Sequence, residues 1–229
     1  MKTMGLLGGM SWESTAEYYR LANETVRERL GGLHSARCVM LSVDFADIEA
    51  MQAEGRWDEA GDALAAEARR LQAGGADFLV LCTNTMHKVA AQIEAAIDIP
   101  MVNLADTTAG AVLAAGLTRV GLLGTRFTME QSFYRDRLAS HGLDVVVPEP
   151  ADIATVNRVI YDELCLGIVR DESRAEYLEV IDRLIGAGAE GIVLGCTEIE
   201  LLVGPDDIAC PAFPTTRIHV EAAVDLALA

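Results

Sequence analysis

The chain contains one sequence pattern twice, and this internal repeat limits its fold more than any other feature. The segment MGLLGGMSW at positions 4–12 is similar to VGLLGTRFT at 120–128, and GGADFLVLCTNT at 74–85 is similar to GAGAEGIVLGCTEI at 186–199. Both pairs of segments occur in the same order along the chain. Two domains of similar fold are the simplest explanation for such a repeat. We therefore expect a domain boundary between residues 100 and 117.

Short apolar runs alternate with helical patterns in each half of the chain. The predicted strands are MGLLG, RCVMLSVDF, ADFLVLC, RVGLLGT, LDVVVP and EGIVLG, and helices are predicted after Ser11 or Ser14, over 58–75 and around 174–189. This alternation, with strands that are apolar throughout, indicates an α/β protein of two pseudo-symmetric domains, each with a parallel sheet flanked by helices. The first domain is expected at 1–105, completed by the C-terminal segment 210–229, and the second at 106–209.

Composition excludes several classes of function. Five scattered cysteines with no metal-ligand spacing predict neither a disulfide framework nor a metal site. A formal net charge of -17 argues against nucleic acid and against an anionic membrane surface. No apolar run approaches the ~18 residues of a membrane span, and the N-terminus lacks a signal-peptide pattern. We therefore expect a cytoplasmic protein.

The repeat also predicts which side chains face a ligand. Aligned without gaps, Cys82 falls on Gly195 and Thr83 falls on Cys196. Ligands of open parallel sheets bind beyond the carboxyl ends of the strands, and adjacent side chains of an extended chain point to opposite sides. Thr83 and Cys196 are therefore expected to face a bound molecule from the two halves, with Cys82 turned inward.

A thiol beside such a site suggests proton transfer. Main-chain amides or a helix N-terminus can lower a thiol pKa from about 8.5, which makes a thiolate base plausible near neutral pH. The chemistry suggested is inversion at a carbon that bears a carboxylate. The glycine turn GLLGGMS lacks the spacing of a dinucleotide fingerprint, so a nucleotide cofactor is not indicated.

Four motifs together carry a family resemblance. GLLGGMSWEST, CTNTMHK, LLGTRFTMEQSFYRDRL and GCTEIELL resemble the aspartate/glutamate racemase family, in particular the bacterial L-aspartate/glutamate-specific or broad-specificity amino acid racemases. The similarity runs along nearly the whole chain. It implies a cofactor-independent isomerase that interconverts L- and D-amino acids in a cleft between its two domains. It also implies a small amino acid as substrate and a homodimer.

The first family motif is altered in this chain. Relatives usually have a cysteine directly before Asn-Thr, whereas here Thr83 precedes Asn84 and Thr85. By the stereochemistry of the family, Cys196 removes the α-proton of L-Asp or L-Glu and Thr83 serves the opposite face. Because a threonine hydroxyl is a far poorer base than a thiolate, the kinetic constants for L-to-D and D-to-L conversion should differ.

Further residues match substrate-binding positions of the family. These are Asn84, Thr85, Thr197 and Glu198. Met10, Ser11 and Thr125 lie in or after the repeated glycine turns and are expected to line the same cleft, chiefly through their backbone. Gln52 and Cys165 stand where many relatives carry an arginine and a lysine. Without these two positive charges, discrimination for acidic substrates should weaken.

Two other functions remain open at this stage. The chain could be a related enzyme of the superfamily, such as a hydantoin racemase, a maleate isomerase or a decarboxylase. It could also be a non-enzymatic amino-acid-binding protein that kept the cleft after losing one cysteine. Exchange of the α-proton distinguishes an enzyme from such a binding protein.

Overall fold

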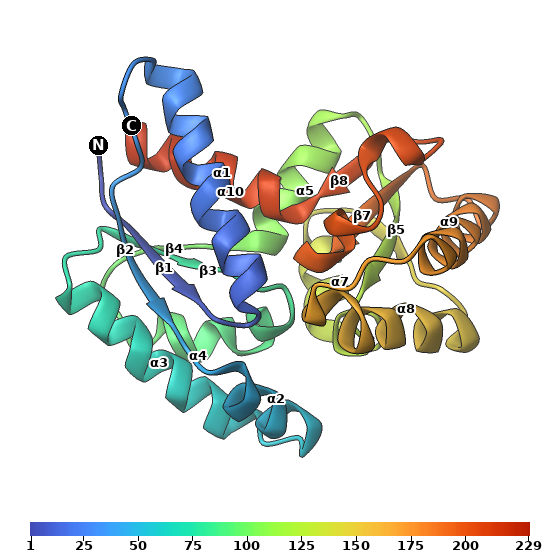
Figure 1. Ribbon diagram of the computed structural model, residues 1–229, viewed down its shortest axis with the longest axis horizontal. Helices are drawn as coiled ribbons and strands as arrows, with labels where there is room; N and C mark the ends of the chain where they lie inside the picture. Colours follow the sequence, from blue (N-terminus) through green and yellow to red (C-terminus); the bar gives the residue numbers. More distant parts are fainter. The chain divides into compact units, whose positions relative to one another are not determined.

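The computed structural model describes all residues from 1 to 229 and divides into two compact units, Met1–Asn103 with His219–Ala229, and Leu104–Ile218 (Figure 1). Each unit contains a four-stranded parallel sheet. The strand orders are β2-β1-β3-β4 and β6-β5-β7-β8. The two orders correspond strand by strand, and the fold is the repeated α/β architecture that the sequence predicts.

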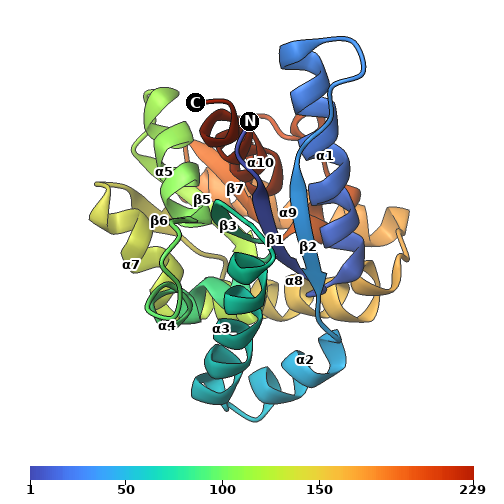
Figure 2. The ribbon, with the colours of Figure 1, turned by 90° about the vertical axis from the view of Figure 1, so that its left-hand side faces the viewer.

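In the first unit, helices cover both faces of the sheet (Figures 1 and 2). The strands are β1 (Met4–Gly8), β2 (Cys38–Ser42), β3 (Phe78–Leu81) and β4 (Met101–Val102). Helices α1 (Trp12–Leu30) and α10 (Thr215–Leu228) pack on one face. Helices α2 (Phe45–Ala53), α3 (Trp57–Ala73) and α4 (Ala90–Glu94) pack on the other. Side chains alternate between the faces, since Leu6 contacts the α1 side and Leu7 the α3 side.

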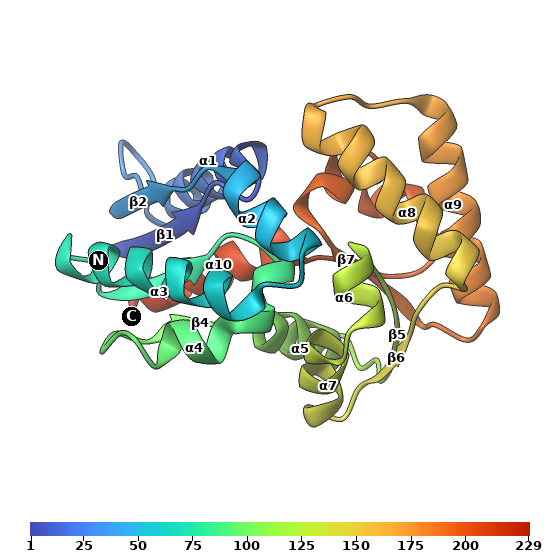
Figure 3. The same cartoon turned by 90° about the horizontal axis from the view of Figure 1, so that it is seen from below.

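The second unit repeats these three layers, with α8 and α9 on one side of its sheet and α5 and α7 on the other (Figure 3). Its strands are β5 (Arg119–Gly124), β6 (Asp144–Val146), β7 (Gly191–Gly195) and β8 (Ala212–Pro214). Its helices are α5 (Leu104–Ala114), α6 (Arg126–Glu130), α7 (Ser132–Ser140), α8 (Pro150–Asp162) and α9 (Asp171–Gly186).

Local sequence signals explain where the long helices begin and end. Ser11 caps α1, because its Oγ accepts a hydrogen bond from the Ser14 N–H at 3.2 Å. The helix ends at Gly31, whose φ of +74° suits a residue without a side chain. Helix α3 buries an apolar stripe at helical spacing and ends before Gly74.

The C-terminal segment enters the first unit later in the chain than residue 210. Residues 212–214 form β8, which pairs with β7 in the second sheet, so this part of the expected segment 210–229 belongs to the second unit. Helix α10 begins in that unit and continues into the first, which resumes at His219. The expected boundary region 100–117 contains the change of unit between Asn103 and Leu104, and most of it is helix α5.

The strand registers agree with the gapless alignment of the repeat. Leu7 pairs with Leu81 in the first sheet, and Leu123 pairs with Leu194 in the second. The alignment makes the same residues equivalent, Leu7 with Leu123 and Leu81 with Leu194. The residues that follow β3 therefore correspond to the residues that follow β7.

Candidate functional site

In the first unit, the ends of two adjacent strands bring most of the expected residues together. Met10 and Ser11 follow β1, whereas Thr83, Asn84 and Thr85 follow β3. The strands are neighbours, and the Cys82 N–H donates to the Leu7 carbonyl at 2.9 Å. All five of the expected residues are buried. They lie at the carboxyl edge of an apolar sheet, and all of them except Met10 have polar side chains.

Cys82 and Thr83 have different surroundings. Cys82 is 0% exposed in the core between the sheet, α1 and α10, and its thiol contacts the Val80 carbonyl at 3.6 Å. Burial raises the pKa of this thiol far above its ordinary value. Thr83 retains 7% exposure. A fully enclosed thiol of this kind is a core residue, and it is not suited to proton transfer.

Thr83 is tied to a buried histidine. The Thr83 carbonyl accepts a hydrogen bond from His87 Nδ1 at 2.7 Å, and because a carbonyl can only accept, Nδ1 carries the proton. The ring of His87 packs edge-on against that of His219, with centroids 5.9 Å apart. His87 therefore contacts the segment after β3 through the backbone of Thr83.

His219 belongs to a buried polar chain that sequence reasoning missed. Its Nε2 donates to the Val102 carbonyl at 2.8 Å, and its Nδ1 therefore accepts from the Tyr18 hydroxyl at 2.9 Å. Burial lowers the pKa of His219 to about 3, with a smaller contribution from His87. No local signal could identify this contact, because Tyr18 and His219 are 201 residues apart in sequence.

Gln52 lies on α2 and is buried. Its Nε2 donates to the Met86 Sδ at 3.0 Å, which places the amide beside the segment that follows Thr83. The expected role of Gln52 in binding substrate, at the position where many relatives have an arginine, stays a prediction. An amide at this place can form hydrogen bonds but cannot neutralise a carboxylate.

In the second unit, the corresponding strand ends carry Thr125 and Cys196. Thr125 follows β5 and caps α6, accepting from the Thr128 N–H at 3.3 Å. Cys196 follows β7, which pairs with β5 along its whole length. Thr197 and Glu198 come next, in the short 3₁₀ helix Thr197–Leu201. Cys196 is 8% exposed, close to the value for Thr83.

Cys196 and Glu198 form a hydrogen-bonded pair. The Cys196 thiol donates to Glu198 Oε2 at 2.9 Å. Burial, followed by the negative charge of Glu198, raises the pKa of the thiol well above its ordinary value. The expected lowering of this pKa is therefore wrong for the resting protein. The thiol is protonated, and the Glu198 carboxylate accepts its hydrogen bond.

The residues after β3 and β7 enter short 3₁₀ helices and not long α-helices. This explains part of the difference between the expected and the observed direction of the pKa shift at Cys196. Thr85–Val89 and Thr197–Leu201 are single 3₁₀ turns, and neither Asn84 nor Cys196 caps its turn through a side chain. Each turn has only a few aligned peptide dipoles, so it attracts negative charge less than an α-helix would. Burial and, after it, the neighbouring carboxylate then raise the pKa of the Cys196 thiol.

Cys165, where relatives often carry a lysine, also lies in the second unit. It is in the 3₁₀ turn Leu164–Cys165–Leu166 and packs at the margin of the core cluster that contains Cys196. The nearby buried charge belongs to Glu163, which bonds Arg158 at 3.0 Å and Ser173 at 2.6 Å. No group of three or more His, Cys, Asp or Glu side chains in the chain could hold a metal ion.

Comparison with known proteins identifies relatives of the whole chain. A family model described as Asp/Glu/Hydantoin racemase matches residues 7–223. A crystal structure of a proposed Asp/Glu racemase from Yersinia pestis has 52% sequence identity and a TM-score of 0.93, with 100% of both chains covered. An aspartate racemase homologue from Pyrococcus horikoshii OT3 has 30% identity and a TM-score of 0.88, again with 100% of both chains covered.

A match to a curated protein covers less of the chain. It is 27% identical over 139 residues to the glutamate racemase of Persephonella marina, covering 59% of this chain and 51% of that protein. The chain thus spans about half the length of that relative. No helix is long and apolar enough to cross a membrane.

Proposed function

Because this chain belongs to the Asp/Glu/Hydantoin racemase family and is an amino acid racemase, we propose that Cys196 and Thr83 move the α-proton of one free amino acid. The single observation that carries this assignment is the common strand register, in which Thr83 and Cys196 hold equivalent places after β3 and β7. The proposal requires their side chains to reach one α-carbon from opposite faces.

The first step concerns the thiol proton. In the resting protein this proton lies on Cys196 and is donated to Glu198 Oε2 at 2.9 Å. A substrate ammonium group near Glu198 would offset its charge and favour the thiolate. The thiol proton then passes to the Glu198 carboxylate. The thiolate removes the α-proton of the L-amino acid, and the electrons of the C–H bond delocalise into the substrate carboxylate.

The second step delivers a proton to the other face. The Thr83 hydroxyl donates to the carbanion, which gives the D-amino acid, and water supplies the hydroxyl with a new proton. Glu198 releases its proton to water, so no net proton is gained or lost. Starting from the D-enantiomer, Thr83 would have to act as the base. Because an alkoxide forms much less readily than a thiolate, kcat for the D-enantiomer should be lower.

We assign L-Asp, L-Glu and a wider set of amino acids as substrates. The amide of Gln52 supports this breadth, because it offers hydrogen bonds but no positive charge to a substrate side chain. Equilibrium still lies at equal L and D, so a lower kcat for the D-enantiomer must be matched by a lower KM. We expect this compensation in the separately measured constants.

The test follows α-proton loss by NMR in deuterated water, starting from each enantiomer of Asp, Glu and several neutral amino acids. Cys196→Ser should abolish exchange. The matched control Cys82→Ser removes a thiol from the adjacent core and should keep most of the exchange. Equal kinetic constants for both enantiomers would contradict the assignment of Thr83. Binding of amino acids by calorimetry without any exchange would contradict the proposed reaction.

A further inference from the structure

The backbone carbonyls of the two equivalent site residues are held in different ways. In the second unit, the Cys196 carbonyl accepts a hydrogen bond from the Ile199 N–H at 3.1 Å, at the start of the 3₁₀ helix that follows. In the first unit the corresponding backbone bond comes one residue later, from the His87 N–H to the Asn84 carbonyl at 3.1 Å. The Thr83 carbonyl therefore lies just before the first turn of its 3₁₀ helix.

The side chain of His87 supplies the bond at this carbonyl. Its Nδ1 donates to the Thr83 carbonyl at 2.7 Å, while its backbone N–H donates to the Asn84 carbonyl. His87 thus holds two consecutive carbonyls. Thr83 is buried, and a buried carbonyl without a donor is unfavourable. The histidine ring takes the place that the Ile199 backbone N–H has in the second unit.

Both backbone polar groups of Thr83 are thereby fixed. Its N–H donates to the Leu81 carbonyl at 2.9 Å, and its carbonyl accepts from His87. The preceding Cys82 N–H is bonded to the Leu7 carbonyl of β1. The Thr83 hydroxyl is carried on a Cα between these fixed groups. Loss of the His87 bond would free one end of the residue, and the hydroxyl would move with it.

His87 is itself held in place. It is buried, and its ring packs edge-on against that of His219, with centroids 5.9 Å apart. Both ring nitrogens of His219 are bonded, one to the Val102 carbonyl and the other to the Tyr18 hydroxyl. His219 therefore presents a fixed surface to His87, which limits the rotation of the His87 ring.

The second unit lacks this arrangement at the equivalent position. In the gapless alignment that places Thr83 on Cys196, His87 falls on Glu200. Glu200 Oε1 accepts a hydrogen bond from the Thr216 N–H at 3.2 Å, and a carboxylate cannot donate one to a carbonyl. The histidine is therefore specific to the half of the chain that has a threonine at the site.

We propose that His87 is a positioning residue that fixes the Thr83 hydroxyl for delivery of the proton in the second step of the reaction. It acts through the Thr83 carbonyl and touches no reacting atom. The inference rests on the proposed function of Thr83. A misplacement of about 1 Å can slow a reaction about 100-fold, so loss of this bond should slow proton delivery by Thr83 more than proton removal by Cys196.

The test measures two quantities in deuterated water with the fastest-exchanging L-amino acid of the panel above. NMR follows the loss of the α-proton, and chiral chromatography follows formation of the D-enantiomer. In His87→Leu, Cys196 can still remove the α-proton and, after its thiol exchanges with solvent, return a deuteron to the same face. The amount of D-enantiomer formed per α-proton lost should therefore fall at least about tenfold. A smaller folded fraction lowers both rates equally and leaves their ratio unchanged.

Matched variants separate the hydrogen bond from the shape of the side chain. His87→Asn has the same branched skeleton as His87→Leu, but its amide nitrogen takes the place of Nδ1 and can donate to the Thr83 carbonyl. It should keep most of the wild-type ratio. Thr83→Val removes the hydroxyl itself and gives the ratio for complete loss of this donor. If His87→Leu does not fold, His87→Gln replaces it, because its amide nitrogen lies one atom farther along the side chain.

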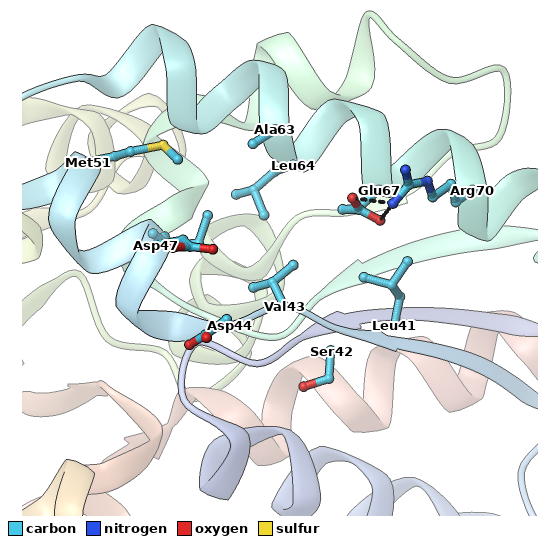
Figure 4. Close-up of a pocket in the computed structure, with 11 residues that line it drawn as sticks. Leu41, Ser42, Val43, Asp44, Asp47, Met51, Ala63, Leu64, Glu67 and Arg70 are labelled. Carbon is cyan, nitrogen blue, oxygen red and sulfur yellow. Dashed lines mark hydrogen bonds and ion pairs between the residues drawn. The ribbon is translucent and has the colours of Figure 1, made fainter.

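Leu41→Ala is the control for a general loss of stability in the first unit. Leu41 of β2 points toward Leu64 in a hollow of about 430 Å³ between β2, α2 and α3 (Figure 4). Truncation there removes apolar contacts, so the midpoint of urea unfolding should fall. The ratio of D-enantiomer to α-proton loss should stay at the wild-type value.

Nitrogen-15 NMR of the histidines provides a measurement that needs no variant at the site. In the wild type, His87 should carry its proton on Nδ1. An unprotonated Nδ1, a folded His87→Leu with the wild-type ratio, or a His87→Asn that behaves like His87→Leu would overturn the role of His87 and leave the proposed function intact. A wild type without exchange, or a Thr83→Val with the wild-type ratio, would instead overturn the proposed function and this inference with it.

Discussion

Cys196 shows how burial and a neighbouring carboxylate can change the protonation expected of a thiol. From its place after an apolar strand, a thiolate stabilised by backbone amides is a reasonable expectation. The structure instead buries the thiol and places Glu198 Oε2 at 2.9 Å from the sulfur, and burial, followed by the carboxylate, raises the pKa of the thiol. Sequence spacing predicts that Cys196 follows a buried strand, but it cannot give the direction in which a side chain two residues away will point.

Replacing Glu198 by glutamine separates the two effects of this carboxylate. Glu198→Gln removes the negative charge, so the thiol pKa should fall, yet it also removes the proton acceptor proposed for catalysis. We expect a thiolate absorbance that appears at lower pH, together with a kcat at least about tenfold lower for L-amino acids. The absorbance is read as the difference from Cys196→Ser. An unchanged titration would show that Glu198 does not control the thiol.

His219 should make stability depend on pH in a defined window. Its folded-state pKa is lowered to about 3 from an ordinary 6.5, so below pH 6.5 the unfolded chain binds a proton that the folded protein does not. Its contribution to stability is complete above pH 6.5 and is lost as the pH falls toward 3. Between pH 7 and 5 the free energy of unfolding should fall by about 2 kcal/mol on account of this residue.

Urea unfolding of wild type and His219→Gln at pH 7 and pH 5 provides the measurement. The variant lacks the titrating ring, so its stability should change less over this interval. The Asp106 carboxyl, whose pKa Arg137 holds below its usual range, loses its contribution only at lower pH and does not obscure the comparison. Equal losses in both proteins would show that His219 is not the cause.

At the scale of single elements, strands with apolar runs were predictable from the sequence, whereas the very short strands were not. Apart from the exposed Arg119 at the start of β5, the central strands β1, β3, β5 and β7 are buried on both faces, so their sequences are continuously apolar. β4 and β8 have only two and three residues, too few to form a pattern in the sequence. They are defined by their pairing with β3 and β7. Helix α5, with the sequence LADTTAGAVLA, occupies most of the region expected to hold a boundary. It was not predicted from the sequence, because its small residues show no clear apolar periodicity.

Gly195 controls how β7 delivers Cys196 to its place. A Cβ added there would lie 2.6 Å from the Leu123 carbonyl oxygen of the paired strand, a contact that backbone atoms cannot relieve easily. Gly195→Ala should therefore lower the free energy of unfolding by about 1–3 kcal/mol and reduce activity by displacing Cys196. The equivalent residue in the first half is Cys82, whose larger side chain packs in the core.

Gly110 is the matched control. It lies inside α5 with nothing within 4 Å of an added Cβ, so Gly110→Ala should raise helix propensity without a clash. We expect a gain of about 0.5–1 kcal/mol in urea unfolding and unchanged activity. Equal effects of the two substitutions would mean that the close approach of β5 and β7 does not constrain residue 195.

For the whole molecule, the repeat made the architecture predictable, and it also predicts which residues of the two halves are equivalent. Once the halves align, each residue at the end of one sheet predicts its counterpart in the other, and the registers of Leu81 and Leu194 agree with that alignment. Long-range contacts such as Tyr18 with His219 have no counterpart in a local pattern. They arise only when α10, far along the chain, packs on the first sheet.

The net charge of -17 should influence which substrates bind well. Asp and Glu carry one more negative charge than a neutral amino acid, so the field of the whole protein opposes their approach, and Gln52 offers no local positive charge in return. The Debye length falls from about 30 Å at 0.01 M salt to about 10 Å at 0.1 M. Raising salt over this range should therefore lower KM for L-Asp and leave KM for a neutral amino acid nearly constant.

Initial rates of α-proton exchange for the two substrates, measured at both salt concentrations, test this expectation. The neutral amino acid controls for any effect of salt on the fold or on the thiol. We expect kcat for both substrates to stay unchanged, because screening acts on approach and binding more than on proton transfer within the bound complex. A KM for L-Asp that rises with salt would indicate the opposite, a local positive charge that outweighs the field of the molecule and selects acidic substrates.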